Sequence, residues 1–301
     1  MLAQIDLNLS SGQIFEINSS REKPYVNSAS VKNTGWEFLV NYRKQLTKDF
    51  SIDATLNLST LKNEVLSLGD NVQPITSGAM SSSFGDSPSI TKPGEAIGSF
   101  YGYKINGFDA DGNFIFADTD NSGSVDANDK VILGNPIPDF SYGLNLTMSY
   151  KDFDLTMFFQ GVQGNEIFNQ KKYTYYFDYS NNCVTDVLNA WTKNNQNTNI
   201  PIMKTQNTDG GNSLPSEFYI EDGSYFRCKN LQLGYNFPKS ILNKISFNKL
   251  RVYAGVQNLF TITNYSGYDP EVSSNALFSR GIDSASYPNA RTFTFGFNAS
   301  F

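Results

Sequence analysis

The sequence contains no histidine and only two cysteines among its 301 residues. Histidine is the commonest metal ligand and the usual general base, so its absence counts against both kinds of site. The spacing of Cys183 and Cys228 supports neither a disulfide nor a zinc site, and we expect two unrelated thiols. With no histidine and no nucleophile motif, the sequence does not predict an enzyme.

Charge is also scarce. Charged residues make up 17% of the chain, whereas an ordinary soluble domain carries about 25%. The net charge is −6 and the pI is about 4.8, which argues against nucleic-acid binding because that needs a basic face. Aromatic residues reach 14%. This composition suits a sheet with one face against lipid and the other against water.

Long apolar runs are missing as well. No segment approaches the roughly 20 apolar residues that a membrane-spanning helix needs. A chain that crosses a membrane without such a helix must do so as a closed β-barrel, because every backbone polar group needs a partner in lipid. Residues 1–6 have no basic region followed by an apolar run, so we expect no signal peptide there.

What the sequence does contain is strict alternation of apolar and polar residues. Over 141–150 every even position is apolar or aromatic and every odd position is small or polar. This period of two predicts a strand, and 153–159 repeats it after Lys151-Asp152, which predicts a hairpin. Strands of about ten residues are long enough to cross a bilayer at a tilt. The same pattern recurs at 36–42, 52–59, 230–237, 250–257 and 292–301, with a further strand near Met1.

The two faces of these strands predict different surroundings. The polar face is mostly Gly, Ser, Thr, Asn and Gln, which is typical of an aqueous lumen. Aromatic residues near strand ends are typical of the girdles at a membrane interface; they are Trp36, Tyr42, Tyr142, Tyr150, Phe237 and Phe260. We therefore expect an all-β fold, an antiparallel transmembrane β-barrel. The alternatives are a surface glycan-binding or adhesion β-sandwich and a small, self-closing eight-stranded barrel.

The connections alternate in length along the chain. Short ones are expected at 44–49, 151–152 and 238–247, and long ones at 16–35, 62–139, 164–221 and 262–290. Bacterial barrels show this pattern, with short periplasmic turns and long extracellular loops. We count eight strands, with up to two more in 97–118, and place 1–301 in one barrel portion. Within it, 62–139 is a large extracellular loop region, and 184–192 is expected to form a short helix.

One loop has the spacing of a metal site. Residues 118–129 resemble an EF-hand loop, with Gly123 at the sixth position, where a sharp turn is needed. Asp at the twelfth position is shorter than the usual Glu, which makes bidentate binding harder. We predict a structural calcium site; the alternative is a polar turn without metal. The expected ligands are Asp118, Asp120, Ser122, Ser124, Asp126 and Asp129.

A cluster of aromatic residues follows the 142–159 hairpin in the next long connection. Aromatic faces stack on sugar rings and line peptide grooves, so these residues are candidate ligand contacts. Packing of the loop onto its neighbours is an equally good explanation. The candidates are Tyr173, Tyr175, Tyr176 and Phe177.

Ordered motifs along nearly the whole chain resemble the C-terminal part of SusC/RagA-like TonB-dependent outer-membrane transporters of the Bacteroidetes type. The segments that carry the resemblance are Asn33-Thr-Gly-Trp-Glu-Phe, Leu58-Ser-Thr-Leu-Lys-Asn-Glu-Val, Pro93-Gly-Glu-Ala-Ile-Gly-Ser-Phe-Tyr-Gly-Tyr, the loop at 118–129, Gly134-Asn-Pro-Ile-Pro-Asp-Phe-Ser-Tyr-Gly, Phe158-Phe-Gln-Gly-Val-Gln-Gly-Asn, Tyr225-Phe-Arg-Cys-Lys-Asn-Leu-Gln-Leu-Gly-Tyr, Val256-Gln-Asn-Leu-Phe and Phe301.

The resemblance implies a 22-stranded barrel with an N-terminal plug and a TonB-engaging motif, neither of which this sequence contains. It implies import of oligosaccharides or peptides across the outer membrane of a Gram-negative cell. The implied partners are a SusD-like surface lipoprotein, the TonB complex acting through the missing N-terminal part, and the barrel-assembly machinery, which would read the terminal Phe301. We therefore interpret the chain as a fragment or a truncated product.

Overall fold

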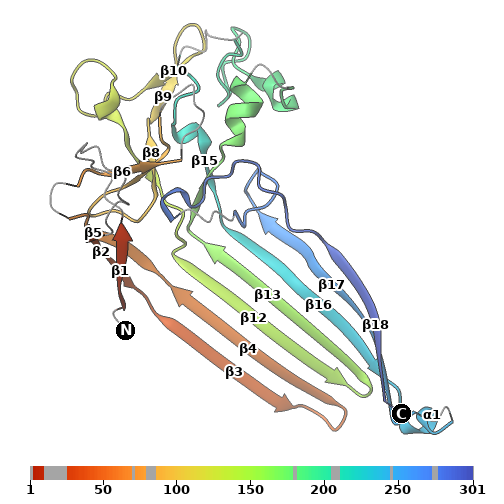
Figure 1. Cartoon of the computed structure of the whole chain (residues 1–301). Coiled ribbons are helices and arrows are strands. Elements are labelled where there is room, and N and C mark those ends of the chain that lie inside the picture. Colours follow the sequence, from red (N-terminus) through yellow and green to blue (C-terminus); the bar gives the residue numbers. More distant parts are fainter. Residues whose placement is uncertain are drawn as a thin grey trace, which may run out of the picture.

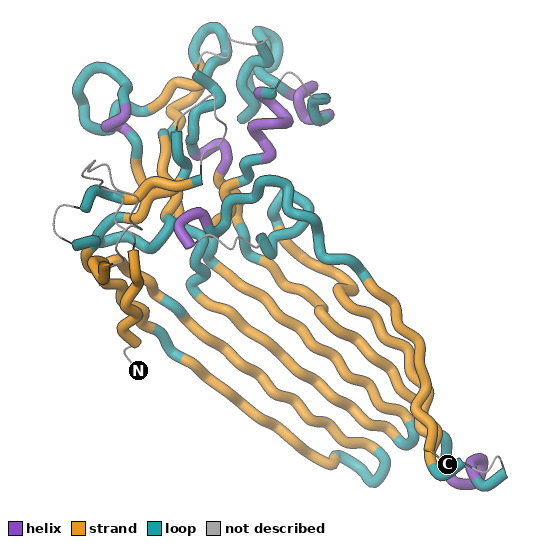
Figure 2. Tube along the Cα trace, in the orientation of Figure 1, coloured by secondary structure: helices purple, strands orange, loops and turns teal. Residues whose placement is uncertain are grey.

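The structure is a computed structural model that describes residues 3–9, 26–69, 72–78, 86–178, 182–204, 211–244, 247–272 and 277–300. Its main element is a seven-stranded antiparallel sheet of long, tilted strands (Figures 1 and 2). In spatial order the strands are β18 (Thr292–Ser300), β17 (Lys249–Thr263), β16 (Tyr225–Asn236), β13 (Phe153–Gln163), β12 (Phe140–Tyr150), β4 (Phe50–Thr60) and β3 (Glu37–Gln45).

Short turns join the strands at one end of the sheet. In the β12–β13 hairpin Tyr150 pairs with Phe153, and Lys151 turns the chain with a φ of 52°. The other two short connections also lie at this end, and the long connections gather at the opposite end (Figure 1). The predicted alternation of short and long connections is therefore confirmed between the wall strands from residue 37 onward. Of the long connection expected at 16–35, residues 16–25 lie outside the described residues and 26–34 form a strand.

The apolar face of the sheet is left uncovered. Among the described residues no second sheet packs against it, and rings such as Phe38, Phe293 and Phe297 are mostly exposed. The polar residues occupy the opposite face, as the alternation predicted. An uncovered apolar face excludes the β-sandwich, whose two sheets bury their apolar faces against each other. The sheet is part of a transmembrane β-barrel wall.

Two cross-strand rows of aromatic rings mark the borders of this apolar face. Near the short turns, Phe50 lies 6.4 Å from Tyr150, and Phe153 lies 4.7 Å from Tyr235, measured between ring centroids. The second row, near the long connections, consists of Tyr142, Phe159, Phe226 and Phe260. Eight residues of strand separate the rows in β12, roughly 26 Å along the strand at 3.3 Å per residue. At the usual tilt of about 40° this spacing corresponds to roughly 20 Å along the membrane normal, which is most of the height of a lipid-facing belt of about 25 Å.

The remaining strands are short and belong to the long connections. The expected eighth strand is not part of the wall: β1 (Ala3–Leu9) pairs with β2 (Val26–Thr34), which pairs with β5 (Lys62–Ser67) in a separate sheet. The self-closing eight-stranded barrel is thereby excluded. The other small sheets contain β6 (Ile75–Ser77), β7 (Ser89–Thr91), β8 (Ser99–Gly102) and β11 (Val131–Gly134), the β9 (Ile105–Phe108)–β10 (Phe114–Phe116) hairpin, and β14 (Glu166–Phe168) with β15 (Ile220–Asp222).

Helical segments are few and short. The helix expected within 184–192 is present as a 3₁₀ turn, η3 (Thr185–Asn189). The others are η1 (Ala127–Asp129), η2 (Tyr173–Phe177), η4 (Glu217–Tyr219), α1 (Lys239–Leu242) and η5 (Leu277–Ser279). Over the described ranges, none of the helices has both the length and the apolar character needed to cross a membrane.

The buried core lies within the long connections, at the end of the sheet opposite the short turns. It is mostly aromatic: the Phe168 ring is stacked on Tyr219 at 5.0 Å and lies 6.0 Å from Phe100. All three side chains are fully buried. The long connections therefore form a packed unit that holds its segments in place above the wall.

Candidate metal loop and charge clusters of the long connections

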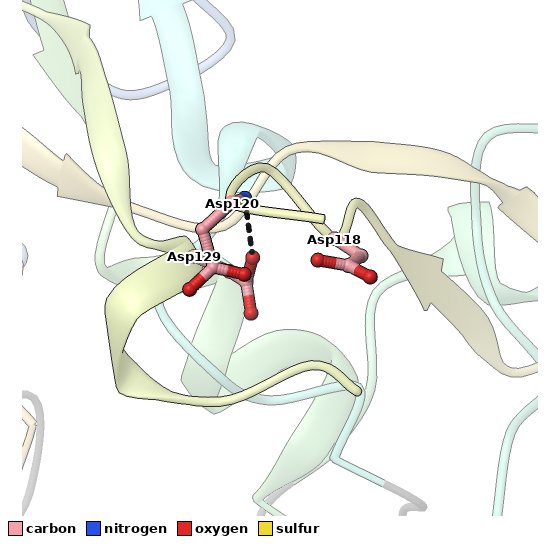
Figure 3. A group of neighbouring side chains, drawn as sticks. All are labelled: Asp118, Asp120 and Asp129. Carbon is pink, nitrogen blue, oxygen red and sulfur yellow. Dashed lines mark hydrogen bonds between the residues drawn. The ribbon is translucent and has the colours of Figure 1, made fainter. Parts of the chain in front are cut away.

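The predicted metal ligands lie in the connection between β10 and β11. Carboxylate oxygens of Asp118, Asp120 and Asp129 lie within 4.8 Å of one another (Figure 3). Asp129 is buried, Asp118 half-buried and Asp120 exposed. Among the described residues, no lysine or arginine forms an ion pair with any of the three. Three carboxylates this close repel one another, and a bound cation would relieve that repulsion.

Backbone hydrogen bonds orient the first two carboxylates. The Ser122 N–H donates to Asp118 Oδ1 and to Asp120 Oδ1, both at 3.0 Å, and the Gly123 N–H donates to Asp118 Oδ2 at 2.8 Å. Gly123 has a φ of 90°, which suits glycine at this sharp turn. The Ser122 hydroxyl donates to the Ser124 carbonyl at 2.9 Å. Each carboxylate oxygen keeps a lone pair for a cation.

The last carboxylate is held by the backbone around it. Asp129 accepts hydrogen bonds from the N–H groups of Asp126 at 2.8 Å and Thr119 at 2.6 Å. These bonds, with that from Asp126 the strongest, keep the pKa of the Asp129 carboxyl below its usual value although burial opposes them. The carboxylate of Asp126 caps η1 by accepting from the Asn128 N–H at 2.7 Å. The loop thus collects Asp118, Asp120 and Asp129 and uses Asp126 as a cap.

The aromatic candidates divide into two groups. Tyr176 and Phe177 are buried in the loop core, where their rings present no open face. Tyr175 is half-buried, and its hydroxyl lies 3.4 Å from that of Tyr268. This hydrogen bond, together with burial, raises the pKa of Tyr175 to about 12, so its hydroxyl stays protonated at neutral pH. Tyr173 packs at the edge of the same core.

A buried charge cluster, which the sequence did not reveal, lies at the upper end of β16. Arg227 is 2% exposed and forms ion pairs with Asp269 and, at 2.9 Å, with Glu271; its Nε donates to Thr261 Oγ1 at 2.8 Å. Asn289 donates to Asp269 from its backbone and its side chain, both at 3.0 Å. The acidic partners belong to the connection between β17 and β18. We call its described parts, residues 264–272 and 277–291, the strap.

A second buried ion pair joins the strap to the segment after β14. Lys171 Nζ lies 2.9 Å from Asp283 Oδ2, and both side chains are almost fully buried. The Tyr265 hydroxyl donates to the same carboxylate oxygen at 2.5 Å. The ammonium also lies 4.2 Å from the ring centroid of Tyr268, which is a favourable cation–π distance.

A third polar cluster joins the strap to β15. Glu221 pairs with Lys172 at 2.9 Å and accepts from the Ser266 N–H at 2.8 Å. Burial raises the pKa of the Glu221 carboxyl, but Lys172 and the hydrogen bonds lower it by more. The net pKa lies below the usual value, so the carboxyl is ionised at neutral pH. No local pattern in the sequence marks Arg227 or Lys171 as members of buried ion pairs. Partners more than 40 residues away could not be deduced from it.

The chain resembles curated TonB-dependent receptors. It is 37% identical over 299 residues to TonB-dependent receptor P3 of Formosa agariphila, covering 91% of this chain and 29% of that protein. It is 32% identical over 284 residues to TonB-dependent receptor SusC of Bacteroides thetaiotaomicron, covering 91% and 27%. The chain thus spans less than a third of the length of these relatives. No protein-family model matches it.

Solved structures show the same fold. The structure of the RagAB peptide transporter matches the whole chain and 32% of its own chain, with a TM-score of 0.79 and 23% identity. The "closed-closed" state of the RagAB peptide importer matches with a TM-score of 0.78. Identity at this level shows the fold, and the curated relatives show the family. The chain therefore belongs to the SusC/RagA-like TonB-dependent receptors, of which it forms a part of the barrel and its long connections.

Proposed function

We propose that the chain forms part of the barrel of a nutrient importer in the outer membrane. The observation that carries this proposal is the contrast between the two faces of the seven-stranded sheet: an uncovered apolar face with two aromatic rows, and a polar face that would line an aqueous path. The cargo would be an oligosaccharide or a peptide. The long connections, with Tyr175 as a contact residue, would meet it at the extracellular side.

The partners follow from the family. A SusD-like surface lipoprotein would cover the extracellular mouth and rest on the long connections. The TonB complex would act through a part of the receptor outside this chain, and the barrel-assembly machinery would insert the barrel. Phe301, the proposed assembly signal, lies outside the described residues.

Complementation of a deletion strain tests this function. Deleting the gene for the full-length receptor should abolish growth on at least one oligosaccharide or peptide supplied as sole carbon source, and the wild-type gene should restore it. Met157→Lys should fail to restore growth, because Met157 lies on the apolar face midway between the aromatic rows. A lysine facing lipid at that depth costs about 2–4 kcal/mol.

Thr156→Lys is the matched control, because Thr156 is next to Met157 in β13 and its side chain points to the opposite, polar face. It should assemble into the outer membrane with wild-type yield and heat-modifiable mobility on gels. Equal assembly of both variants would refute the assignment of the two faces. Normal growth of the deletion strain on every substrate would refute import.

We also propose that the loop at 118–129 binds calcium as a structural ion, through Asp118, Asp120 and Asp129, with Ser122, Ser124 and Asp126 completing the predicted set. What supports it is that carboxylate oxygens of three aspartates lie within 4.8 Å of one another. Calcium binds six to eight oxygens, so water or backbone carbonyls would complete the shell. The ion would stiffen the connection between β10 and β11.

Calcium should stabilise the intact receptor against unfolding. At a concentration 100-fold above the Kd, binding adds about 2.7 kcal/mol, measurable as a higher melting temperature in calcium than in EGTA. The double variant Asp118→Ala/Asp120→Ala should lose this shift. Asp111→Ala, in the exposed β9–β10 turn, should keep it. The same calcium shift in the double variant and in Asp111→Ala would remove the proposed site.

A further inference from the structure

The strap lies on the inner, polar side of the barrel wall. In the upper part of β16 the Phe226 ring lies among the rings of Tyr142, Phe159 and Phe260 on the outer face. Adjacent residues in a strand point to opposite faces, so Arg227 points inward. Because Arg227 is buried by carboxylates of the strap, the strap must be folded against the inner face.

A β-bulge produces this inward arginine. The pairing of β16 with β13 skips Lys229, so Cys228 faces Phe159 while Asn230 faces Phe158. Below the bulge the odd-numbered residues of β16 face outward, and above it the even-numbered ones do. Without this extra residue, the guanidinium would face the side that carries the aromatic row.

The strap is attached along its length, as well as at its two ends. Arg227 holds its first part through Asp269, and Asn289 near its far end donates to the same carboxylate. In between, the strap pairs with β14. The Phe168 N–H donates to the Gly281 carbonyl at 3.0 Å, and the Asp283 N–H donates to the Phe168 carbonyl at 2.9 Å. Figure 1 shows the strap, in dark blue, crossing from the upper ends of β17 and β18 toward β6.

We propose that the strap is a fixed inner lining of the pore at its extracellular end, and that Arg227 is the residue that positions it. The strap narrows this side of the mouth whether or not cargo is present. It also holds aromatic surface in a set place: the Tyr268 side chain is 65% exposed while its ring is fixed by Lys171 and Tyr175. A side chain that is both exposed and held in position contacts a ligand at low entropic cost.

This proposal goes beyond import, and hydrogen exchange on the full-length receptor tests it without any substrate. In the wild type, strap peptides should exchange at least 10-fold more slowly than an unstructured peptide. Arg227→Gln should accelerate exchange across 264–272 and 283–291 at least 10-fold, because Asp269 and Glu271 lose the guanidinium that they share and only Glu271 keeps an ion pair, with Lys229 at 2.7 Å. Peptides of the β12–β13 hairpin should be unchanged. Arg227→Lys should protect only partly, since lysine lacks the two-pronged geometry.

Arg251→Gln is the matched control. Arg251 is also an inner-face arginine, paired with Asp154 at 2.5 Å, but it lies lower in the wall and does not touch the strap. Its replacement should leave strap exchange unchanged. Should Arg227→Gln fail to assemble, Asp269→Asn breaks the same contact from the strap side. Fast exchange of the wild-type strap, or equal effects of the Arg227 and Arg251 variants, would overturn the proposal and leave the import function untouched.

Discussion

Asp283→Asn is expected to lower the free energy of unfolding of the long-connection unit by about 3–5 kcal/mol. The substitution keeps the size of the side chain and removes its charge, so the buried ammonium of Lys171 loses its carboxylate. The side chain of Lys171 is only 4% exposed, and water cannot replace the lost partner. Hydrogen exchange of the strap peptides in the full-length receptor would report the loss.

Two further variants test whether the loss of stability comes from leaving a buried charge unpaired or from the substitution itself. Asp53→Asn removes the same group from the Arg43–Asp53 pair, where the arginine is 84% exposed, and should cost at most about 1 kcal/mol. The double variant Lys171→Met/Asp283→Asn removes both buried charges and should recover most of the lost stability. A cost for Asp283→Asn no greater than that for Asp53→Asn would show that the pair is not important for stability.

The Lys171–Asp283 ion pair also makes the free energy of unfolding depend on pH, and the sign of that dependence can be predicted. Burial raises the pKa of Asp283, but the hydrogen bonds from Tyr265 and Lys171 outweigh it and leave the pKa below its usual value of 3.8. A carboxyl whose pKa is depressed in the folded state stabilises that state fully above its unfolded pKa, which is close to the usual value, and loses this effect as the pH falls through the folded pKa. The difference between wild type and Asp283→Asn should therefore be constant near neutral pH and shrink below about pH 3.8.

Phe168→Ala should have an effect of similar size, about 3–5 kcal/mol, through loss of packing. The Phe168 side chain is fully buried between Phe100 and Tyr219, and its backbone is bonded to the strap on both sides. The cavity left by the ring would loosen β14, β15 and the strap together. Because each 1.4 kcal/mol is a factor of ten, exchange in peptides covering β14 and β15 should accelerate by roughly two to four orders of magnitude.

Tyr287→Ala serves as the control for that experiment. It removes an equally large aromatic group from the strap. Because Tyr287 is 93% exposed, the free energy of unfolding should change by no more than about 0.5 kcal/mol. If Phe168→Ala had no more effect than Tyr287→Ala, the aromatic core would not be what holds the long connections together.

The wall of the barrel could be predicted from the sequence because it depends on local pattern. Alternation over 141–150 and 153–159 specifies which residues face lipid, and the structure pairs these segments residue by residue. The positions of the short turns follow from the same pattern. The expected family was also correct, since its motifs are spread along the chain.

The charge clusters could not be predicted because they depend on contacts between distant segments. The apolar positions of β16 shift from even numbers at 226–228 to odd numbers at 231–235, which marks the bulge at Lys229. Nothing near Arg227, however, indicates that its partner is Asp269. The aromatic run at 173–177 illustrates the same limit. Composition showed a cluster, and only the fold separates the buried Tyr176 and Phe177 from the half-buried Tyr175.

The location of the buried core has a consequence for how such a receptor diverges between species. Lipid hydrocarbon tails have no fixed shape, so the outward residues of the sheet need only remain apolar. One aliphatic side chain can therefore be substituted for another at little cost in stability. The aromatic core around Phe168 is close-packed, so each substitution there must match its neighbours in volume. The outward wall residues of related receptors should therefore vary freely among apolar types. The residues of the aromatic core should be substituted rarely, and several of them together.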